Sequence, residues 1–236
     1  MNSAFGDQQN STPSRRRFLA IGLSATAAGL FTRSMDVVAQ TPAGVQNPTT
    51  PAAAVAELVA GNKRFVSGKT TAEEYDRTIL RDHLVLKQEP FAAVLSCADS
   101  RVPVEEIFDQ TIGHLFVTRV AGNFVTPEIM ASLEYGAAVL GTKAILVLGH
   151  ANCGAVKATI EAKDVPGQIS VIYQHIQPAI KQSGTDLVAA TKANAKAQAT
   201  LLAETSTVIA AMVKAEKIKV VAGYYDVGSG EVTLLD

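Results

Sequence analysis

Both cysteines of this chain lie in short polar motifs that directly follow apolar runs. The first motif, Cys-Ala-Asp-Ser-Arg, begins at Cys97, and the second, His-Ala-Asn-Cys-Gly, begins at His150 and contains Cys153. Two thiolates and one imidazole form a ligand set that Zn²⁺ accepts, and three protein ligands leave a fourth position open for a reacting molecule. These residue types therefore predict a catalytic zinc site built from Cys97, His150 and Cys153.

Two other uses of the thiols are compatible with their spacing. Free cysteine is often buried as a small apolar side chain, and two cysteines of an exported protein can form a disulfide. We favour the metal site because each motif contributes one cysteine, because His150 precedes Cys153 by three residues, and because the ion-pairable Asp99 and Arg101 follow Cys97. A helix beginning at Cys153 would add to this preference, since the positive end of a helix favours a thiolate.

The elements that must position these motifs alternate between strand-like and helix-like patterns. Apolar runs of strand length occupy 91–96, 115–120, 144–148 and 218–225. The spacing of apolar residues predicts helices over about 51–68, 71–88, 127–140, 154–162 and 186–214. This alternation predicts an α/β fold with a mostly parallel central sheet flanked by helices. Turn-forming residues over 226–231, followed by 232–235, predict an antiparallel edge strand.

The two motifs should meet at one edge of this sheet. The Cys97 motif directly follows the predicted strand 91–96, and the His150 motif directly follows 144–148. In open α/β sheets, functional groups collect at the carboxyl ends of the strands. We therefore expect both motifs to contribute to one site.

The first 39 residues have the pattern of an export signal rather than of a folded element. Three arginines at 15–17 precede an apolar run over 19–31, and small residues of the kind that a signal peptidase recognises end the segment at Ala39. The pattern Ser-Arg-Arg-x-Phe-Leu from Ser14 resembles a twin-arginine signal, which exports folded proteins. An ordinary secretory signal with a chance arginine triplet is the alternative.

This pattern divides the chain into three parts. We predict a signal peptide over 1–39, a flexible linker rich in small residues and proline over 40–51, and a folded domain over 52–236. The mature protein would then be exported, to a periplasm or to a thylakoid lumen, with no permanent membrane span after signal removal. The whole chain has 21 basic and 22 acidic residues and a formal net charge of −1, so its charge gives no reason to expect nucleic acid as a partner.

Taken together, these motifs resemble those of the β-class carbonic anhydrases. The resemblance rests on Cys97-x-Asp99-Ser100-Arg101 and His150-x-x-Cys153-Gly154, with Gly-Asn-Lys-Arg-Phe at 61–65 in the first helix, and it extends over about 52–236. It implies the β-carbonic-anhydrase fold, one Zn²⁺ per chain on Cys97, His150 and Cys153, and a homodimer or higher homo-oligomer. It also implies that Asp99 and Arg101 form the catalytic pair.

The activity that this resemblance implies is that of a carbonate dehydratase, a zinc lyase. Such an enzyme interconverts CO₂ with bicarbonate and a proton by attack of a zinc-bound hydroxide. Arg101 would keep Asp99 ionised, so that Asp99 accepts a hydrogen bond from the hydroxide. In some members of the family this carboxylate instead becomes the fourth zinc ligand and closes the site, and for Asp99 the sequence is compatible with both states.

Two alternative functions share the same residues. A few relatives with this fold and zinc triad hydrolyse carbon disulfide or carbonyl sulfide. A catalytically silent zinc-binding assembly module is the other alternative. The intact Asp99 and Arg101 disfavour the silent module, because a purely structural zinc would prefer a fourth protein ligand.

Overall fold

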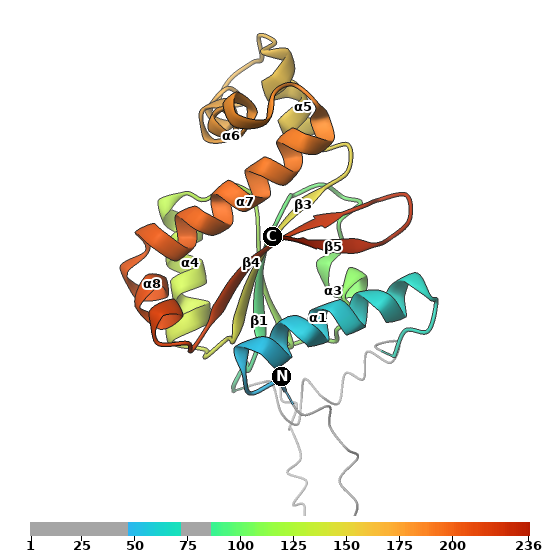
Figure 1. The fold of residues 1–236 in the computed structure, drawn as a ribbon, viewed down its shortest axis with the longest axis vertical. Helices are drawn as coiled ribbons and strands as arrows, with labels where there is room; N and C mark the ends of the chain where they lie inside the picture. Colours follow the sequence, from blue (N-terminus) through green and yellow to red (C-terminus); the bar gives the residue numbers. More distant parts are fainter. Residues whose placement is uncertain (1–46, 72–85) are drawn as a thin grey trace, which may run out of the picture. The chain divides into compact units, whose positions relative to one another are not determined.

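The fold alternates strands and helices around one sheet (Figure 1). The computed structural model describes residues 47–71 and 86–236. The strands are β1 (Ala92–Ser96), β2 (Leu115–Arg119), β3 (Ala144–His150), β4 (Lys219–Tyr225) and β5 (Val232–Leu235). The helices are α1 (Pro51–Val66), α3 (Val104–Ile107), α4 (Pro127–Ala138), α5 (Gly154–Glu161), α6 (Val171–Ser183), α7 (Leu187–Thr205) and α8 (Thr207–Lys214).

The central sheet is mostly parallel, as the sequence predicts. Its strand order is β2-β1-β3-β4-β5, in which the first four strands are parallel and β5 pairs antiparallel with β4. Ser96 at the end of β1 pairs with Leu148 of β3 and with Arg119 of β2. This register places the residues that follow β1 level with the end of β3, so that Cys97 and His150 share one edge of the sheet.

Helices cover both faces of the sheet (Figure 1). Val94, Leu146 and Leu148 pack with the apolar residues of α1 and α3 on one face. Leu95, Ile145 and Val147 pack with α4, α7 and α8 on the other. Every residue of β1 and β3 is buried, which explains why these strands read as continuous apolar runs.

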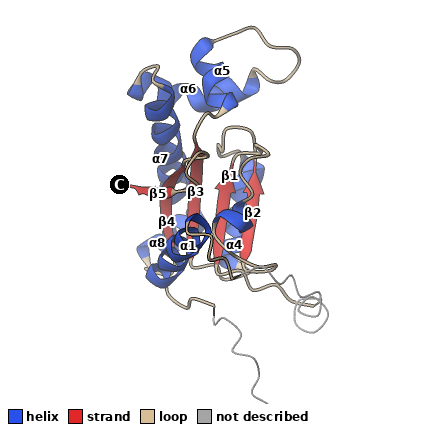
Figure 2. Cartoon of the chain, turned by 90° about the vertical axis from the view of Figure 1, so that its right-hand side faces the viewer, coloured by secondary structure: helices blue, strands red, loops and turns tan. Residues whose placement is uncertain are grey.

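A third apolar cluster lies at the carboxyl edge of the sheet, where α5 and α6 stand beyond the ends of the strands (Figure 2). It contains both cysteines together with Phe124 and Ile176. The cluster surrounds the two cysteine side chains with apolar groups, whereas Ser100 and Arg101 of the first motif are exposed.

The helix starts follow from their caps. Thr50 accepts a hydrogen bond from the backbone N–H of Ala53 at the start of α1, and Thr126 accepts one from Ile129 at the start of α4. A proline occupies the first turn of each of these helices, where it costs no hydrogen bond.

The prediction of one helix over 186–214 is wrong, because the structure divides this stretch into α7 and α8 at Ser206. The buried Ser206 hydroxyl donates to Glu134 Oε1 at 2.6 Å and accepts from the N–H of Ile209 at 3.0 Å. Ser206 therefore caps α8 and ties it to α4. The partner that fixes this break lies 72 residues away in the sequence.

A second difference concerns the helix predicted over 71–88. Most of it lies outside the described residues, but 86–90 are not helical, so the predicted end at Gln88 is wrong. Pro90 restricts the residue before it to extended backbone, which opposes a helix here.

The predicted signal peptide over 1–39 and most of the predicted linker also lie outside the described ranges. Among the helices that are described, none combines the length and the apolar character that crossing a membrane requires.

Candidate metal centre

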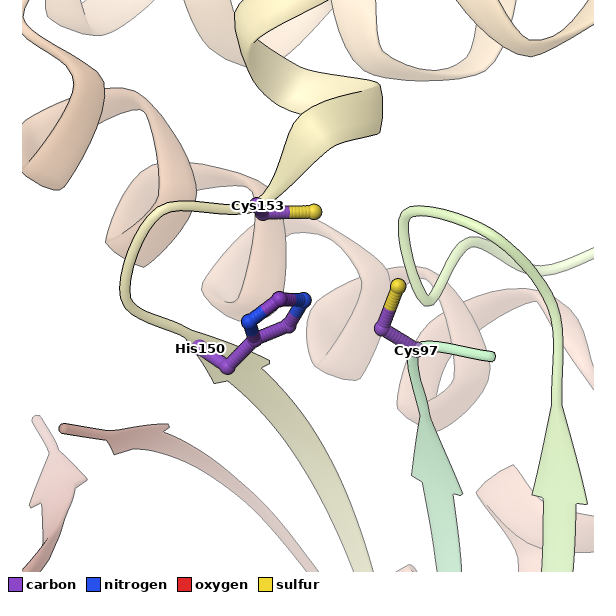
Figure 3. Close-up of side chains that lie close together, drawn as sticks. All are labelled: Cys97, His150 and Cys153. Carbon is purple, nitrogen blue, oxygen red and sulfur yellow. The ribbon is translucent and has the colours of Figure 1, made fainter. Parts of the chain in front are cut away.

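Cys97, His150 and Cys153 meet at the carboxyl edge of the sheet (Figure 3). Cys97 follows the last residue of β1, His150 is the last residue of β3, and Cys153 is the residue that precedes α5. The sulfur atoms and a ring nitrogen of His150 all lie within 4.8 Å of one another. Both cysteines are free thiols, and all three side chains are buried.

The His150 ring presents an unused nitrogen to the two sulfur atoms. Its Nδ1 lies 2.9 Å from the Ala151 carbonyl oxygen, which can only accept, so in the neutral ring Nδ1 donates and Nε2 keeps its lone pair. Nε2 is buried and has no hydrogen-bond partner among the described residues. A buried polar atom without a partner destabilises a fold. A metal ion bound to Nε2 would remove this deficit, so the donor set fits one.

The two thiols influence each other strongly. A hydrogen bond from Cys153 is the main cause that lowers the pKa of Cys97 to about 4, and the backbone N–H of Gly122, which lies 3.3 Å from the sulfur, lowers it further. The hydrogen bond to Cys97 and burial raise the pKa of Cys153. The protein alone therefore stabilises one thiolate, and a divalent cation would favour ionisation of both sulfur atoms.

The loop that carries His150 and Cys153 turns sharply into α5. Asn152 adopts a left-handed conformation with φ of 54°, which asparagine tolerates better than most residues. Cys153 then precedes the helix, and the N–H groups of Ala155 and Val156 act to lower the pKa of its thiol. This agrees with the predicted helix start at the second cysteine.

Asp99 and Arg101 form a two-point ion pair at the rim of the cluster. Arg101 donates from Nε to Asp99 Oδ1 at 3.0 Å and from Nη2 to Oδ2 at 2.8 Å. These hydrogen bonds hold the pKa of the Asp99 carboxyl well below its usual range. Asp99 Oδ2 lies 3.9 Å from His150 Nε2, and 19% of the Asp99 side chain is exposed, so the carboxylate faces both the cluster and solvent.

Two arginines fix the loop between Cys97 and Arg101. Arg119 at the end of β2 donates to the carbonyl oxygens of Cys97, at 3.0 Å, and Asp99, at 2.6 Å. Arg101 Nη2 also donates to the carbonyl oxygen of Asn152 at 3.3 Å. The two motifs are thereby connected by a hydrogen bond as well as by a common metal-binding geometry.

The structure therefore brings all five predicted site residues together, and it adds supporting contacts to which the sequence assigned no role. The N–H of Gly122 contacts the sulfur of Cys97, and Asn194 of α7 donates to the Gly122 carbonyl oxygen at 2.9 Å. Asn123 is fully buried, and neither atom of its amide has a partner in the described part of the chain. Asn194 belongs to no motif, so only its position in the fold shows its relation to the site.

Comparison with known proteins gives consistent results. A family model described as carbonic anhydrase matches residues 92–232, which is more than half of the chain. Over 136 residues the chain is 42% identical to a carbonic anhydrase of Mycolicibacterium smegmatis, and 38% identical over 138 residues to carbonic anhydrase 2 of Mycobacterium tuberculosis. These matches cover 55% and 56% of this chain and only 65% of the length of each relative.

A solved structure is similar over a larger share of the chain. The β-carbonic anhydrase CafA of Aspergillus fumigatus superposes with a TM-score of 0.63 at 25% identity. The superposition covers 77% of this chain and 90% of CafA.

A mostly parallel sheet with a buried Cys–His–Cys set at its carboxyl edge places this chain among proteins of the β-carbonic-anhydrase fold. The chain belongs to the carbonic anhydrase family.

Proposed function

We propose that this protein is an exported zinc carbonic anhydrase that interconverts CO₂ with bicarbonate and a proton. The observation that carries the proposal is the buried Cys97, His150 and Cys153 set with the Asp99–Arg101 ion pair at its rim. Family membership and the names of the two mycobacterial relatives support the reaction.

Cys97, His150 and Cys153 would hold one Zn²⁺ per chain. The unpartnered Nε2 of His150 and the closely spaced sulfur atoms are the features that fit the ion. When bound, zinc would supply Lewis acidity that makes a water molecule a nucleophile near neutral pH.

The chain's own contribution is to orient the reacting water. An ionised Asp99 can only accept hydrogen bonds, so it would take one from the water and direct an oxygen lone pair toward CO₂. Arg101 keeps Asp99 ionised and fixes its plane through two hydrogen bonds. Because both carboxylate oxygens are engaged by Arg101, we propose that Asp99 acts in this way and is not a metal ligand in this arrangement.

The alternative functions are less well supported. The relatives reported above are named carbonic anhydrases, which favours CO₂ over carbon disulfide or carbonyl sulfide as substrate. A silent zinc-binding module would not require Asp99 to be ionised and partly exposed beside the metal ligands.

A CO₂ hydration assay with the purified mature protein tests the proposal. We expect activity with about one zinc per chain, loss of activity after chelation, and recovery after zinc is restored. Asp99→Asn should keep the metal but lower kcat/KM by about 10² to 10⁴, because the neutral amide cannot replace the ionised acceptor. Zinc-free wild-type protein with full activity, or sulfide release from carbonyl sulfide without CO₂ hydration, would overturn the assignment.

Export is the part of the proposal that rests on sequence alone. The arginines at 15–17 and the apolar run that follows support it. Replacement of Arg15 and Arg16 by lysine should leave the uncleaved precursor in the cytoplasm, as measured by fractionation and immunoblotting. Unchanged export of this variant would indicate the ordinary secretory route.

We also propose that the chain forms a homodimer or a higher homo-oligomer. Tyr135 of α4 and Val139, which directly follows this helix, are large apolar side chains that are 47% and 65% exposed. The helix packs beside the edge strand β2, where Phe116 approaches the Tyr135 ring. Light scattering after gel filtration measures the assembly state, and a monomer at micromolar concentration would contradict the proposal.

A further inference from the structure

The face of α7 that packs on the sheet carries polar side chains where apolar ones would be expected. Thr191, Asn194 and Gln198 are all at most 7% exposed, and they follow the helical spacing i, i+3, i+7. Amide side chains are seldom buried unless hydrogen bonds require them. The residues around them show what these bonds support.

Asn194 connects α7 to a sulfur atom of the candidate metal centre through one residue. Its Nδ2 donates to the Gly122 carbonyl oxygen at 2.9 Å, and the N–H of Gly122 lies 3.3 Å from Cys97 Sγ. Both hydrogen bonds are buried. The helix is thus connected to the sulfur of Cys97 through Gly122, without direct contact.

The backbone at Gly122 needs such an anchor. Gly122 has φ of +89°, which L side chains rarely adopt, and a Cβ there would lie 2.7 Å from Cδ1 of Ile176, so this position strongly favours glycine. Glycine, however, has the most freely rotating backbone. The carbonyl and the N–H of Gly122 belong to adjacent peptide planes, which its φ and ψ connect. A hydrogen bond that holds the carbonyl therefore removes part of the backbone motion by which the N–H could turn away from the sulfur.

The same face of α7 also supports the strand that carries the histidine. A Cβ atom on Gly149, the residue before His150, would lie 3.1 Å from Cγ2 of Thr191. The helix therefore packs against the backbone next to two of the three predicted ligands. Groups that orient a metal ligand from outside typically change metal affinity about 10- to 100-fold when they are removed.

We propose that Asn194 is a positioning residue for the metal centre, which holds the Gly122 N–H against the Cys97 sulfur and thereby strengthens metal binding. The inference rests on the proposed zinc site, but it does not depend on CO₂ hydration.

The test compares two non-donating variants with a matched control. Asn194→Ala removes the amide, and Asn194→Leu removes the donor but keeps the same number of side-chain heavy atoms and the same branching, in a bulkier side chain. Gln198→Ala is the control, because Gln198 is buried on the same helix face and binds Val125 N–H and the His175 carbonyl oxygen, but not Gly122. Thermal unfolding of each protein shows whether it is folded. If one of the two Asn194 variants does not fold, the other variant still tests the proposal.

The measurements are zinc affinity, by competition with a chromophoric chelator, and the sulfur-to-cobalt charge-transfer absorption of the Co²⁺-loaded protein. We expect both Asn194 variants to bind zinc about 10-fold more weakly and to shift the charge-transfer band. Gln198→Ala should leave both readouts near those of the wild type. A merely structural role would lower thermal stability without moving the cobalt band.

Two results separate this inference from the proposed function. If the wild-type protein binds no zinc, the proposed function itself fails. If the wild type binds zinc and folded Asn194 variants match it in affinity and spectrum, or if Gln198→Ala weakens binding equally, the positioning role is overturned while the zinc site stands.

Discussion

Two buried polar clusters of this protein differ in whether other groups of the protein supply all of their hydrogen-bond partners. The metal centre leaves His150 Nε2 without a hydrogen-bond partner among the described residues. The other cluster lies between α1 and the loop after α3, where the fully buried carboxylate of Asp109 accepts from Arg64 Nε and from the backbone N–H and hydroxyl of Thr71. Protein groups supply the partners of the second cluster, as in a structural network, whereas the unpartnered nitrogen of the first lies among metal-ligating side chains and fits a bound ion.

The second cluster, which we call the α1 brace, extends beyond this carboxylate. Glu57 accepts from Arg64 at 2.9 Å and from Gln110 at 3.1 Å, and Gln110 also binds the His114 ring. Asn62 donates to two carbonyl oxygens, on Ile107 and Gly230, and accepts from the N–H of Val232. The 61–65 motif that contributed to the family resemblance thus fastens α1 to the sheet rather than reaching the metal ligands.

The largest effect should come from removing a predicted ligand. Cys153→Ala leaves only one sulfur and one imidazole, so we expect the protein to lose zinc and essentially all CO₂ hydration while it remains folded. Metal analysis, the hydration assay and circular dichroism measure these outcomes. Retention of one zinc per chain by this variant would show that the ion binds elsewhere.

A substitution in the α1 brace should have a smaller effect of the opposite kind: it should lower stability and leave zinc binding unchanged. Arg64→Ala removes the charged partner of the buried Asp109 carboxylate, so the free energy of unfolding should fall by about 2 to 4 kcal/mol. The folded variant should bind zinc like the wild type. Lys63→Ala, on an exposed neighbouring position of α1, is the control and should unfold like the wild type. Loss of zinc affinity without loss of stability in Arg64→Ala would contradict the division between the two clusters.

The sequence predicts the metal centre better than it predicts the groups that support it. The ligands were identifiable because two cysteines and a histidine have distinctive chemistry and directly follow apolar strands. By contrast, Asn194 acts on Gly122 from 72 residues away, and the break at Ser206 depends on Glu134 at the same separation. Such pairings arise only when helices pack on the sheet, so local spacing carries no sign of them.

The same reason explains the uneven prediction of the helices. Those over 51–68, 127–140 and 154–162 begin at local caps or at strand ends, and the structure reproduces them within a few residues. The one-turn helix α3 was not predicted, because four residues are too few for a periodic pattern. Short elements and helix breaks are thus determined by tertiary packing.

The smallest predicted effect is a pH dependence of stability within the α1 brace. Burial lowers the pKa of His114 from its ordinary value of 6.5, while Glu57 acts in the opposite direction. As the pH falls below about 6.5, the unfolded chain therefore binds a proton at this histidine before the folded protein does, and stability decreases. Above that pH neither state is protonated there, so this contribution no longer changes.

His114→Gln removes this titration and keeps a group that can hydrogen-bond to Gln110. Its free energy of unfolding should depend less on pH between about 6.5 and 5 than that of the wild type, as measured by urea unfolding at a series of pH values. The range stops above the ordinary pKa values of aspartate and glutamate, so that carboxylates contribute little to the difference. Parallel pH profiles for the two proteins would show that His114 is not protonated differently in the folded and unfolded states, and the α1 brace would then be insensitive to mild acid.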